Sequence, residues 1–372
     1  MTTLAPRAAA PTASVIADRG AWDRLRPEWN RLASASPVDC PMLRHEWFTA
    51  FLDAFAGDQT LHTVTVRREG RLTAVAPLIR RAARWRGLRY QALTALANPH
   101  SSRFDVLAET ADDLRALWQA LRTSGGWDAI ELRDVPEGGR GAELAELAGK
   151  DGHSVHRWES MRTPYVPLEG HRVSGKLGQN LRRRRRRLEE AGRVEVRELT
   201  GGAGLDAFLE QGFSLEAAGW KGKAGTAIAC HPATRAFYRS LARSAERLGW
   251  LALYGLFCGE RLAAFQFGLR DGGRYYLPKP AYDESLGSCS PGQLLMAEVL
   301  ERSRAQGLAE LDFLGPSMPW KRDWTDRERS HHWHWIHAPT PRGQALWVGK
   351  TVAAEAARRL IGRLEATLPW RR

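Results

Sequence analysis

The sequence predicts an α/β (α+β) fold in which one arrangement occurs twice, each time as a mixed twisted sheet flanked by helices. Two hairpin patterns support this prediction, one over residues 61–79 and one over 250–269. Each is followed by a helix and a further strand. The 372 residues, of which 43% are hydrophobic, are enough for two domains with their own cores. The repeat is clearer in the order of the elements than in the residues.

Changes in composition divide the chain. The first residues are rich in alanine, proline and threonine and lack the basic and apolar regions of a signal peptide. The prolines and glycines of residues 160–175 indicate a connection between two units. We therefore expect a disordered leader at 1–12, a first unit at 13–165, a second unit at 166–340 and a C-terminal helix at 341–372.

Periodicity predicts the elements of the first unit in turn. Trp22, Leu25 and Trp29 recur at helical spacing, whereas alternating apolar residues predict the strands. Residues 68–71 form the turn of the first hairpin. The expected elements are a strand at 13–17, helices at 21–33 and 44–55, strands at 61–66, 72–79 and near 88–96, a helix at 111–122, a strand at 127–132 and a helix at 141–149.

The second unit contains the most informative pattern. Residues 274–283 predict a buried strand that runs into a loop, and residues 309–313 alternate as a second strand. Between them, Ser290 is expected as the N-cap of a helix and Pro291 as its first residue. Gly292 allows a ligand to approach the backbone closely. A helix start of this kind presents unpaired N–H groups and a positive dipole end, which suit a phosphate group.

The positive charge is concentrated in the second half of the chain. The formal net charge is +13, of which residues 1–170 contribute +1 (22 basic, 21 acidic) and residues 171–372 contribute +12 (33 basic, 21 acidic). This asymmetry indicates an anionic partner: a phosphorylated cofactor, a lipid or sugar phosphate, or nucleic acid. GC-rich coding is the alternative explanation for the total charge, because arginine outnumbers lysine 48 to 7.

The cysteines and the hydropathy indicate a cytoplasmic protein. Cys40, Cys230, Cys258 and Cys289 are widely spaced and form no C-x-x-C pair, so no zinc site or redox pair is predicted. Free thiols are typical of a reducing compartment. No run of about 18 apolar residues occurs, so no transmembrane helix is expected.

Two segments invite a binding role. Six successive arginines occupy residues 182–187, and Leu181 and Leu188 predict that they lie on a helix with one buried face. A solvated helix face with one or two anion-contacting arginines is favoured over a nucleic-acid arm. Residues 330–337 contain His332 and His334 on one face of a predicted strand, but no third metal ligand, so histidines at a sheet edge are expected.

Four side chains near the predicted anion loop are candidates for catalysis. Lysine is scarce here, so Lys279 and Lys321 suit contact with a phosphate or an oxyanion. Asp283 can act as a general base toward an acceptor, and Tyr282 can return a proton to a leaving thiolate. The expected catalytic residues are Asp283, Lys279, Tyr282 and Lys321, with Glu216, Lys221 and Glu284 nearby.

The second half of the chain resembles a known superfamily in several short motifs. They extend from Leu181-Arg-Arg through Trp220-Lys221, Lys279-Pro-Ala-Tyr-Asp and Ser290-Pro-Gly to Trp320-Lys321. With these residues the chain resembles the GNAT superfamily, and more narrowly the CelD/BcsL-type acetyltransferase group, which is related to the Fem-type aminoacyl transferases. The resemblance covers residues 14–325 and is strongest over 176–324.

The resemblance implies tandem GNAT-like units and acyl transfer from acetyl-CoA or another acyl-CoA to an amine or hydroxyl acceptor, in polysaccharide or cell-envelope biosynthesis. It places the donor phosphates at Ser290, Pro291, Gly292 and Gln293, and it implies no metal. Only Gly292 remains of the glycine-rich turn of the superfamily. A Fem-like transferase that uses aminoacyl-tRNA and a non-catalytic anion-binding module are the alternatives. Basic residues such as Arg358 and Arg363 in the C-terminal helix also allow peripheral membrane contact.

Overall fold

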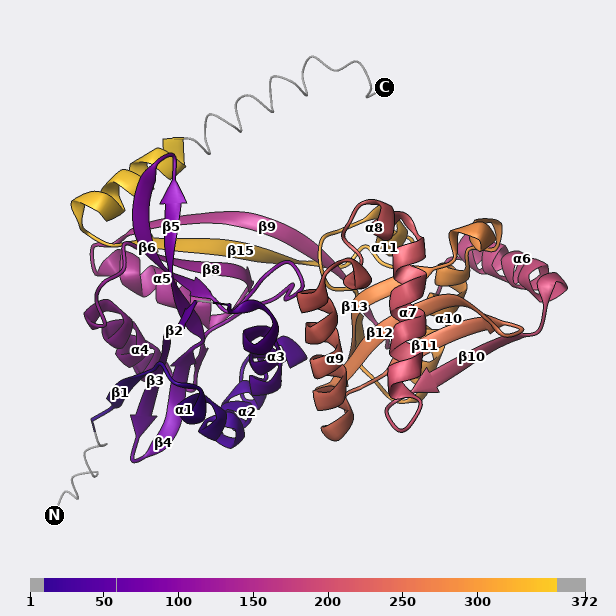
Figure 1. The fold of residues 1–372 in the computed structure, drawn as a ribbon, viewed down its shortest axis with the longest axis horizontal. Helices are drawn as coiled ribbons and strands as arrows, with labels where there is room; N and C mark the ends of the chain where they lie inside the picture. The colour runs from indigo at the N-terminus through magenta and orange to yellow at the C-terminus, as the bar shows by residue number, and fades with distance from the viewer. Residues whose placement is uncertain (1–9, 58, 353–372) are drawn as a thin grey trace.

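The computed structural model describes residues 10–57 and 59–352 and shows an α/β architecture in two lobes (Figure 1). Most of the predicted leader, and the last part of the predicted C-terminal helix with its arginines, lie outside the described residues. Within them, residues 341–352 are helical, and no helix is long and apolar enough to cross a membrane.

The first lobe follows the predicted order with local differences. The expected helix at 21–33 is two helices, because Pro27 lacks an N–H and clashes with the preceding turn. The elements are β1 (Thr12–Ile16), α1 (Arg19–Arg24), α2 (Arg26–Ser34), η1 (Pro41–Leu43), α3 (His45–Phe55), β2 (Thr60–Leu61), β3 (Thr63–Arg68), β4 (Arg71–Ala76), β5 (Leu78–Trp85), β6 (Leu88–Ala95), β7 (Leu107–Ala108), α4 (Ala111–Thr123), β8 (Ala129–Pro136) and α5 (Arg140–Lys150).

The second lobe contains the arginine-rich helix, a hairpin and the predicted strand–helix–strand segment. Its elements are α6 (Gly175–Ala191), β10 (Val194–Leu199), α7 (Leu205–Ala218), α8 (Trp220–Lys223), η2 (Ile228–Cys230), α9 (Pro232–Arg247), β11 (Leu253–Cys258), β12 (Arg261–Asp271), β13 (Arg274–Tyr282), η3 (Glu284–Cys289), α10 (Pro291–Ala305), β14 (Glu310–Asp312) and α11 (Pro319–Arg322). The expected helix with a buried face is confirmed at α6, where Leu181 and Leu188 are buried.

The two lobes repeat one topology. In the first, β1 pairs with β3 and β3 with β4, all antiparallel. In the second, β10, β11 and β12 pair in the same way. Helices separate the first two of these strands in each lobe: α1, α2 and α3 in the first, and α7, α8 and α9 in the second. A parallel pair then follows, β6 with β8 and β13 with β14, and each pair is joined through a helix, α4 or α10. The two repeated units expected from the sequence, each a mixed sheet flanked by helices, are therefore present.

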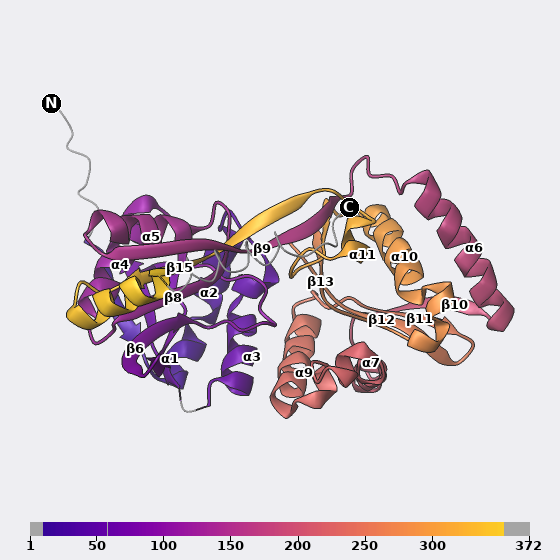
Figure 2. The ribbon, with the colours of Figure 1, turned by 90° about the horizontal axis from the view of Figure 1, so that it is seen from above.

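Two long strands join the lobes. β9 (Ser154–Pro167) pairs along most of its length with β15 (Glu328–His337), and its last residues pair with β14 of the second lobe. β15 in turn pairs with β8 of the first lobe. Each lobe thus receives the final strand of the other, and Figures 1 and 2 show the two strands crossing between them.

These shared strands correct two expectations. Residues 160–167 were expected within a connection, but they are part of β9, which also crosses the expected unit boundary at 165. The prolines are tolerated because a strand can place a residue without an N–H where no ladder bond is needed. β15 is not an edge strand, since it lies between β8 and β9 in the sheet order. β15 is central in the sheet because the lobes exchange strands.

Buried contacts hold the lobes together. α3 packs against α9 of the second lobe, with Trp47 and Phe237 edge to face at 5.3 Å. Arg103 of the first lobe donates to Asp312 of β14 at 2.8 Å, and both side chains are buried. Arg103 and Arg329 hold the pKa of Asp312 below its ordinary value, although burial opposes them. The ends of β13 and β14 therefore have a fixed position relative to the first lobe.

Candidate functional site

A cavity of about 580 Å³ lies where β13 and β14 separate. The two strands pair in parallel only as far as Tyr276 and Asp312, whereas β13 continues to Tyr282. Beyond this point the residues of β13 form one wall and the segment after β14 forms the other. Ligands of open α/β sheets bind at the carboxyl ends of parallel strands, so the position suits a substrate. His100 and Ser102 contribute to the wall from the first lobe.

The N-terminus of α10 opens into this cavity. Ser290 is the N-cap residue, as predicted, but its backbone is left-handed (φ 46°) and its side chain makes no cap hydrogen bond. Its hydroxyl instead donates to the Gly287 carbonyl at 3.3 Å. No acidic residue lies in the first turn. The Gly292 N–H has no partner among the described residues and lies in the cavity wall, so it can donate to an anion.

Gln293 connects the cavity to the arginine-rich helix. Its carbonyl oxygen accepts from Arg184 of α6, and its amide nitrogen donates to Asp323 at 2.9 Å. The side chain is therefore held between a cation and a carboxylate. Of the predicted donor-binding residues, Ser290, Gly292 and Gln293 line the cavity. Pro291 does not, and it starts the helix instead.

Lys279 lies in the cavity within a small charged cluster. Its Nζ is 3.9 Å from a carboxylate oxygen of Glu216, which accepts from Lys221 at 2.9 Å and from the Ile228 N–H at 2.7 Å. Burial lowers the pKa of Lys279, an effect that Glu216 opposes and Lys221 reinforces. Lys279 donates no hydrogen bond within the described chain, so it has capacity left for a ligand.

Lys321 supports the loop after β14. Its ammonium donates to the Leu314 carbonyl at 2.5 Å and to the Pro316 carbonyl at 2.8 Å. Burial lowers its pKa to about 8, while Asp312 acts in the opposite direction. These two bonds fix the backbone that forms the second wall of the cavity. The geometry thus gives Lys321 a clear positioning role beside the cavity.

The other two predicted catalytic residues, Tyr282 and Asp283, differ in their position relative to the cavity. Tyr282 lines the cavity at its mouth, where its side chain is 41% exposed. Asp283 is absent from the lining and accepts from both the N–H and the hydroxyl of Ser285, at 3.0 and 2.8 Å. It also pairs with Arg261. Asp283 therefore caps the start of η3, the turn that leads to the anion loop.

Tyr238 was not predicted as a site residue. It lies on α9, lines the cavity, is 0% exposed and has a hydroxyl with no hydrogen-bond partner in the described structure. Burial and the nearby Glu216 raise its pKa well above the ordinary value, so it stays a donor. The sequence signal was weak, because Phe237-Tyr238 has the spacing of a buried helix face. His100 was also missed; burial lowers its pKa to about 4.

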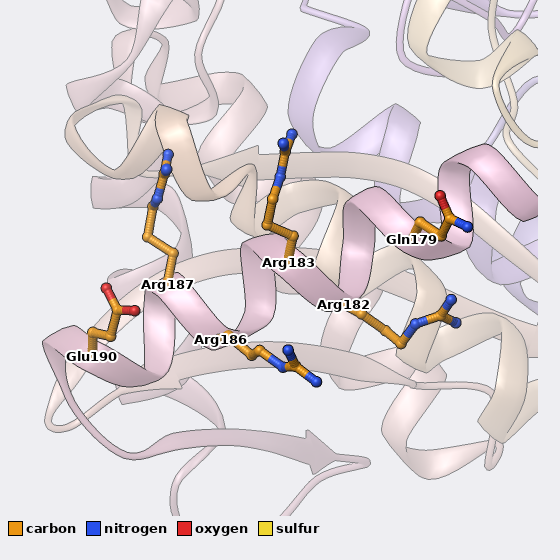
Figure 3. A pocket seen from close by; sticks show the side chains of 6 residues that line it. All are labelled: Gln179, Arg182, Arg183, Arg186, Arg187 and Glu190. Carbon is orange, nitrogen blue, oxygen red and sulfur yellow. The ribbon is translucent and has the colours of Figure 1, made fainter.

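Four arginines form a ridge on the outer face of α6. Arg182, Arg183, Arg186 and Arg187 line a groove of about 420 Å³, and none forms an ion pair among the described residues (Figure 3). At 3.6 residues per turn they span an arc of about 140°, opposite the buried leucines. Most other described arginines have a carboxylate partner, as Arg185 has in Glu189 at 3.0 Å. The ridge therefore has charge available for an anionic partner.

The histidines of β15 occupy separate environments. His331 contacts Arg103, and His332 contacts Arg157 at 3.0 Å. A bulge interrupts the pairing next to His332, but the predicted alternation holds: the His332 and His334 rings lie 6.2 Å apart, and Trp333 and Trp335 both contact Trp158. No group of three or more histidine, cysteine, aspartate or glutamate side chains suited to a metal ion occurs among the residues that the structure describes.

Comparisons with known proteins give a similar domain and a similar fold. Residues 175–322 match the family model of the acetyltransferase (GNAT) domain. This segment is therefore similar to GNAT acetyltransferase domains. It includes α10 and most of the residues that line the cavity. The search of curated proteins found no sequence that matches the chain. The narrower CelD/BcsL assignment stays a prediction.

Solved structures show the same fold across both lobes. The chain resembles the C-terminal domain of a putative lysylphosphatidylglycerol synthetase from Agrobacterium fabrum at 11% identity and a TM-score of 0.54, over 87% of this chain and 95% of that one. It resembles FemX at 11% identity and a TM-score of 0.56, over 87% and 97%. The repeated architecture therefore extends over nearly the full length of these structures.

Proposed function

We propose that the protein is an acyltransferase that moves an acyl group, with acetyl as the first candidate, from acyl-CoA to an amine or hydroxyl acceptor. The observation that carries the proposal is the free Gly292 N–H at the uncapped start of α10, which lies in a cavity at the ends of two parallel strands. A GNAT domain match over the same residues supports it. Cell-envelope or polysaccharide biosynthesis is the proposed setting.

The proposed reaction is direct transfer in a ternary complex. The acceptor nitrogen or oxygen attacks the thioester carbonyl carbon, the C–S bond breaks, and coenzyme A leaves as a thiolate. Lys279 orients the acceptor, and Tyr282, at the cavity mouth, gives its proton to the thiolate and regains the proton that the acceptor loses, through solvent at the mouth. Lys321 and Asp283 hold the loops on either side. Much of the rate then comes from holding two substrates together.

Calorimetry with acetyl-CoA tests the donor directly. We expect binding in the micromolar to millimolar range, and release of free thiol when a suitable acceptor is added. If acetyl-CoA and longer acyl-CoA thioesters all fail to bind at millimolar concentration, the proposed donor is wrong. Binding without any transfer, across a broad panel of acceptors, would instead favour a non-catalytic anion-binding module.

The arginine ridge favours a second candidate, a transferase that takes its acyl group from aminoacyl-tRNA. Unpaired guanidinium groups in two i, i+4 rows suit a phosphate backbone, and the spacing along each row is about 6 Å. If Arg182, Arg183, Arg186 and Arg187 each contact a phosphate, the slope of log affinity against log salt is roughly −3 to −4. Changing all four to glutamine removes this slope while leaving affinity for coenzyme A unchanged.

The proposed location is the cytoplasm. Cys40, Cys230, Cys258 and Cys289 are all free thiols. Free cysteines are the usual state in a reducing compartment, which is also where acyl-CoA is available. This location can be checked with a reporter fused to the chain. In intact cells, a thiol reagent that cannot cross the membrane should not react with the reporter.

A further inference from the structure

Two donors without hydrogen-bond partners belong to residues that line the same end of the cavity. The Tyr238 hydroxyl is fully buried with no partner, and the Lys279 ammonium, which is mostly buried, donates no hydrogen bond within the described chain. They are neighbours, because Lys279 Nζ lies 5.7 Å from the centre of the Tyr238 ring. A buried polar group without a partner is costly, and such groups persist where a ligand supplies the missing partner.

The charges around these donors leave a positive excess. Glu216 is the nearest carboxylate, but its oxygens already accept from Lys221 Nζ and the Ile228 N–H. Its single negative charge faces two ammonium groups, those of Lys221 and Lys279. His100, which closes this end from the first lobe, is neutral at physiological pH because burial lowers its pKa to about 4. The uncompensated charge therefore favours an anionic ligand.

We propose that Lys279 and Tyr238 bind a carboxylate of the acceptor, so that the acceptor is an amine or alcohol that carries a carboxyl group. One ammonium and one hydroxyl can each donate to one oxygen of a carboxylate. This proposal rests on the proposed function and names the substrate class of the same cavity. The end formed by Lys279, Tyr238 and His100 is the acceptor subsite, and the Gly292 end is the donor subsite.

Product-like ligands test the proposal without turnover. A panel of N-acetyl amino acids with varied side chains is compared by calorimetry with the matching carboxamides, in the presence of coenzyme A. We expect at least one acid to bind tenfold or more tightly than its amide. Lys279→Met should abolish this preference, and Tyr238→Phe should reduce it several-fold. Equal affinity within every pair, or a preference that survives Lys279→Met, overturns the proposal.

Controls separate this result from misfolding and from failure of the donor assignment. Tyr238→Phe removes a hydroxyl that bonds to nothing in the described structure, so its unfolding free energy should be unchanged or higher. Tyr254→Phe, at a buried tyrosine outside the cavity lining, should leave the acid preference intact. Affinity for coenzyme A alone is measured in each variant and in the unmodified protein. If the unmodified protein binds coenzyme A but shows no preference for the acids, only the acceptor proposal is wrong. If the unmodified protein does not bind coenzyme A, the proposed donor is wrong.

Discussion

The helices α4 and α10 occupy equivalent places in the two lobes, yet their N-termini differ in charge. The Thr110 hydroxyl accepts from the Asp113 N–H at 3.1 Å and caps α4, and Asp112 and Asp113 lie in its first turn. α10 has no side-chain cap and no acidic residue in its first turn. Its second residue is Gly292, whereas the second residue of α4 is Asp112.

This difference shows how one architecture serves two purposes. The first lobe supplies its own hydroxyl and carboxylates to the positive end of α4, so that end needs no ligand. The second lobe leaves the positive end of α10 open and places it in a cavity. We infer that the first lobe has a structural role and contributes His100 to the acceptor end, while the second lobe holds the donor.

The largest expected effect comes from breaking the contact between the lobes. Arg103→Ala leaves the buried Asp312 with Arg329, at 3.1 Å, as its remaining ion-pair partner among the described residues, besides the Leu314 N–H that donates to it at 2.9 Å. Removing one partner of a buried ion pair typically costs about 3–5 kcal/mol, so we expect a loss of this order in the free energy of unfolding by urea. Arg329→Ala is the matched control and should cost about 1 kcal/mol, because this arginine is partly exposed. Equal costs would contradict the assignment of Arg103 as the main link.

The lowered pKa of Lys321 should make the free energy of unfolding depend on pH. Its pKa of about 8 in the folded protein lies below its ordinary value, so between these values the unfolded chain binds more protons. Stability should therefore rise with pH from about 8 to about 10.5, by up to the order of 3 kcal/mol. Urea unfolding at several pH values should show this rise in the unmodified protein and in the exposed control Lys223→Met, but not in Lys321→Met. If stability rises with pH in Lys321→Met as much as it does in the unmodified protein, the prediction is wrong.

A bulky side chain at the start of α10 should close the donor subsite. A Cβ at Gly292 meets only ordinary contacts, with Tyr282 at 3.5 Å, so Gly292→Phe should fold. Its ring fills the space beside the free N–H, and we expect acetyl-CoA affinity to fall at least a hundredfold, or about 2.8 kcal/mol. Asp112→Phe at the equivalent position of α4 should leave this affinity unchanged. Calorimetry measures the affinity for acetyl-CoA in both variants. If this affinity falls equally in both, the proposed difference between the two helices is wrong.

The smallest expected effect concerns the caps themselves. Thr110→Ala removes a side-chain cap and should lower the free energy of unfolding by about 1 kcal/mol. Ser290→Ala removes a hydroxyl that caps nothing, so the change should stay within about 0.5 kcal/mol. Chemical denaturation of both variants at one pH makes the comparison. A larger cost at Ser290 would show that the start of α10 depends on its own side chain.

Local patterns predicted much of the fold. Alternation at β3, β4, β11 and β12 and helical spacing at α3, α4 and α10 identify elements whose stability depends on burying one face. The proline at the start of α10 and the glycine after it also predicted the anion loop. The split between α1 and α2 at Pro27, and the strand β9 over residues expected as a connection, were not recovered because prolines have several local roles.

The candidate site was only partly predictable. The predicted residues that line the cavity are Lys279, Tyr282, Ser290, Gly292, Gln293 and Lys321. Most were singled out because they lie near one loop in the sequence, and the two lysines also because lysine is scarce. Tyr238 and His100 come from distant segments, so only folding places them beside Lys279. Asp283 has the same local pattern as its neighbours, but its side chain turns away to cap η3.

By itself, the sequence determined most of the segments that form helices and strands, and where positive charge accumulates, because these depend on neighbours within a few residues. Only the tertiary structure decided that β9 and β15 are shared between lobes and that β13 and β14 separate beyond Tyr276 and Asp312. It also decided which buried donors lack partners, as the Tyr238 hydroxyl does. The physical reason is that strand pairing and burial depend on contacts between residues far apart in the chain.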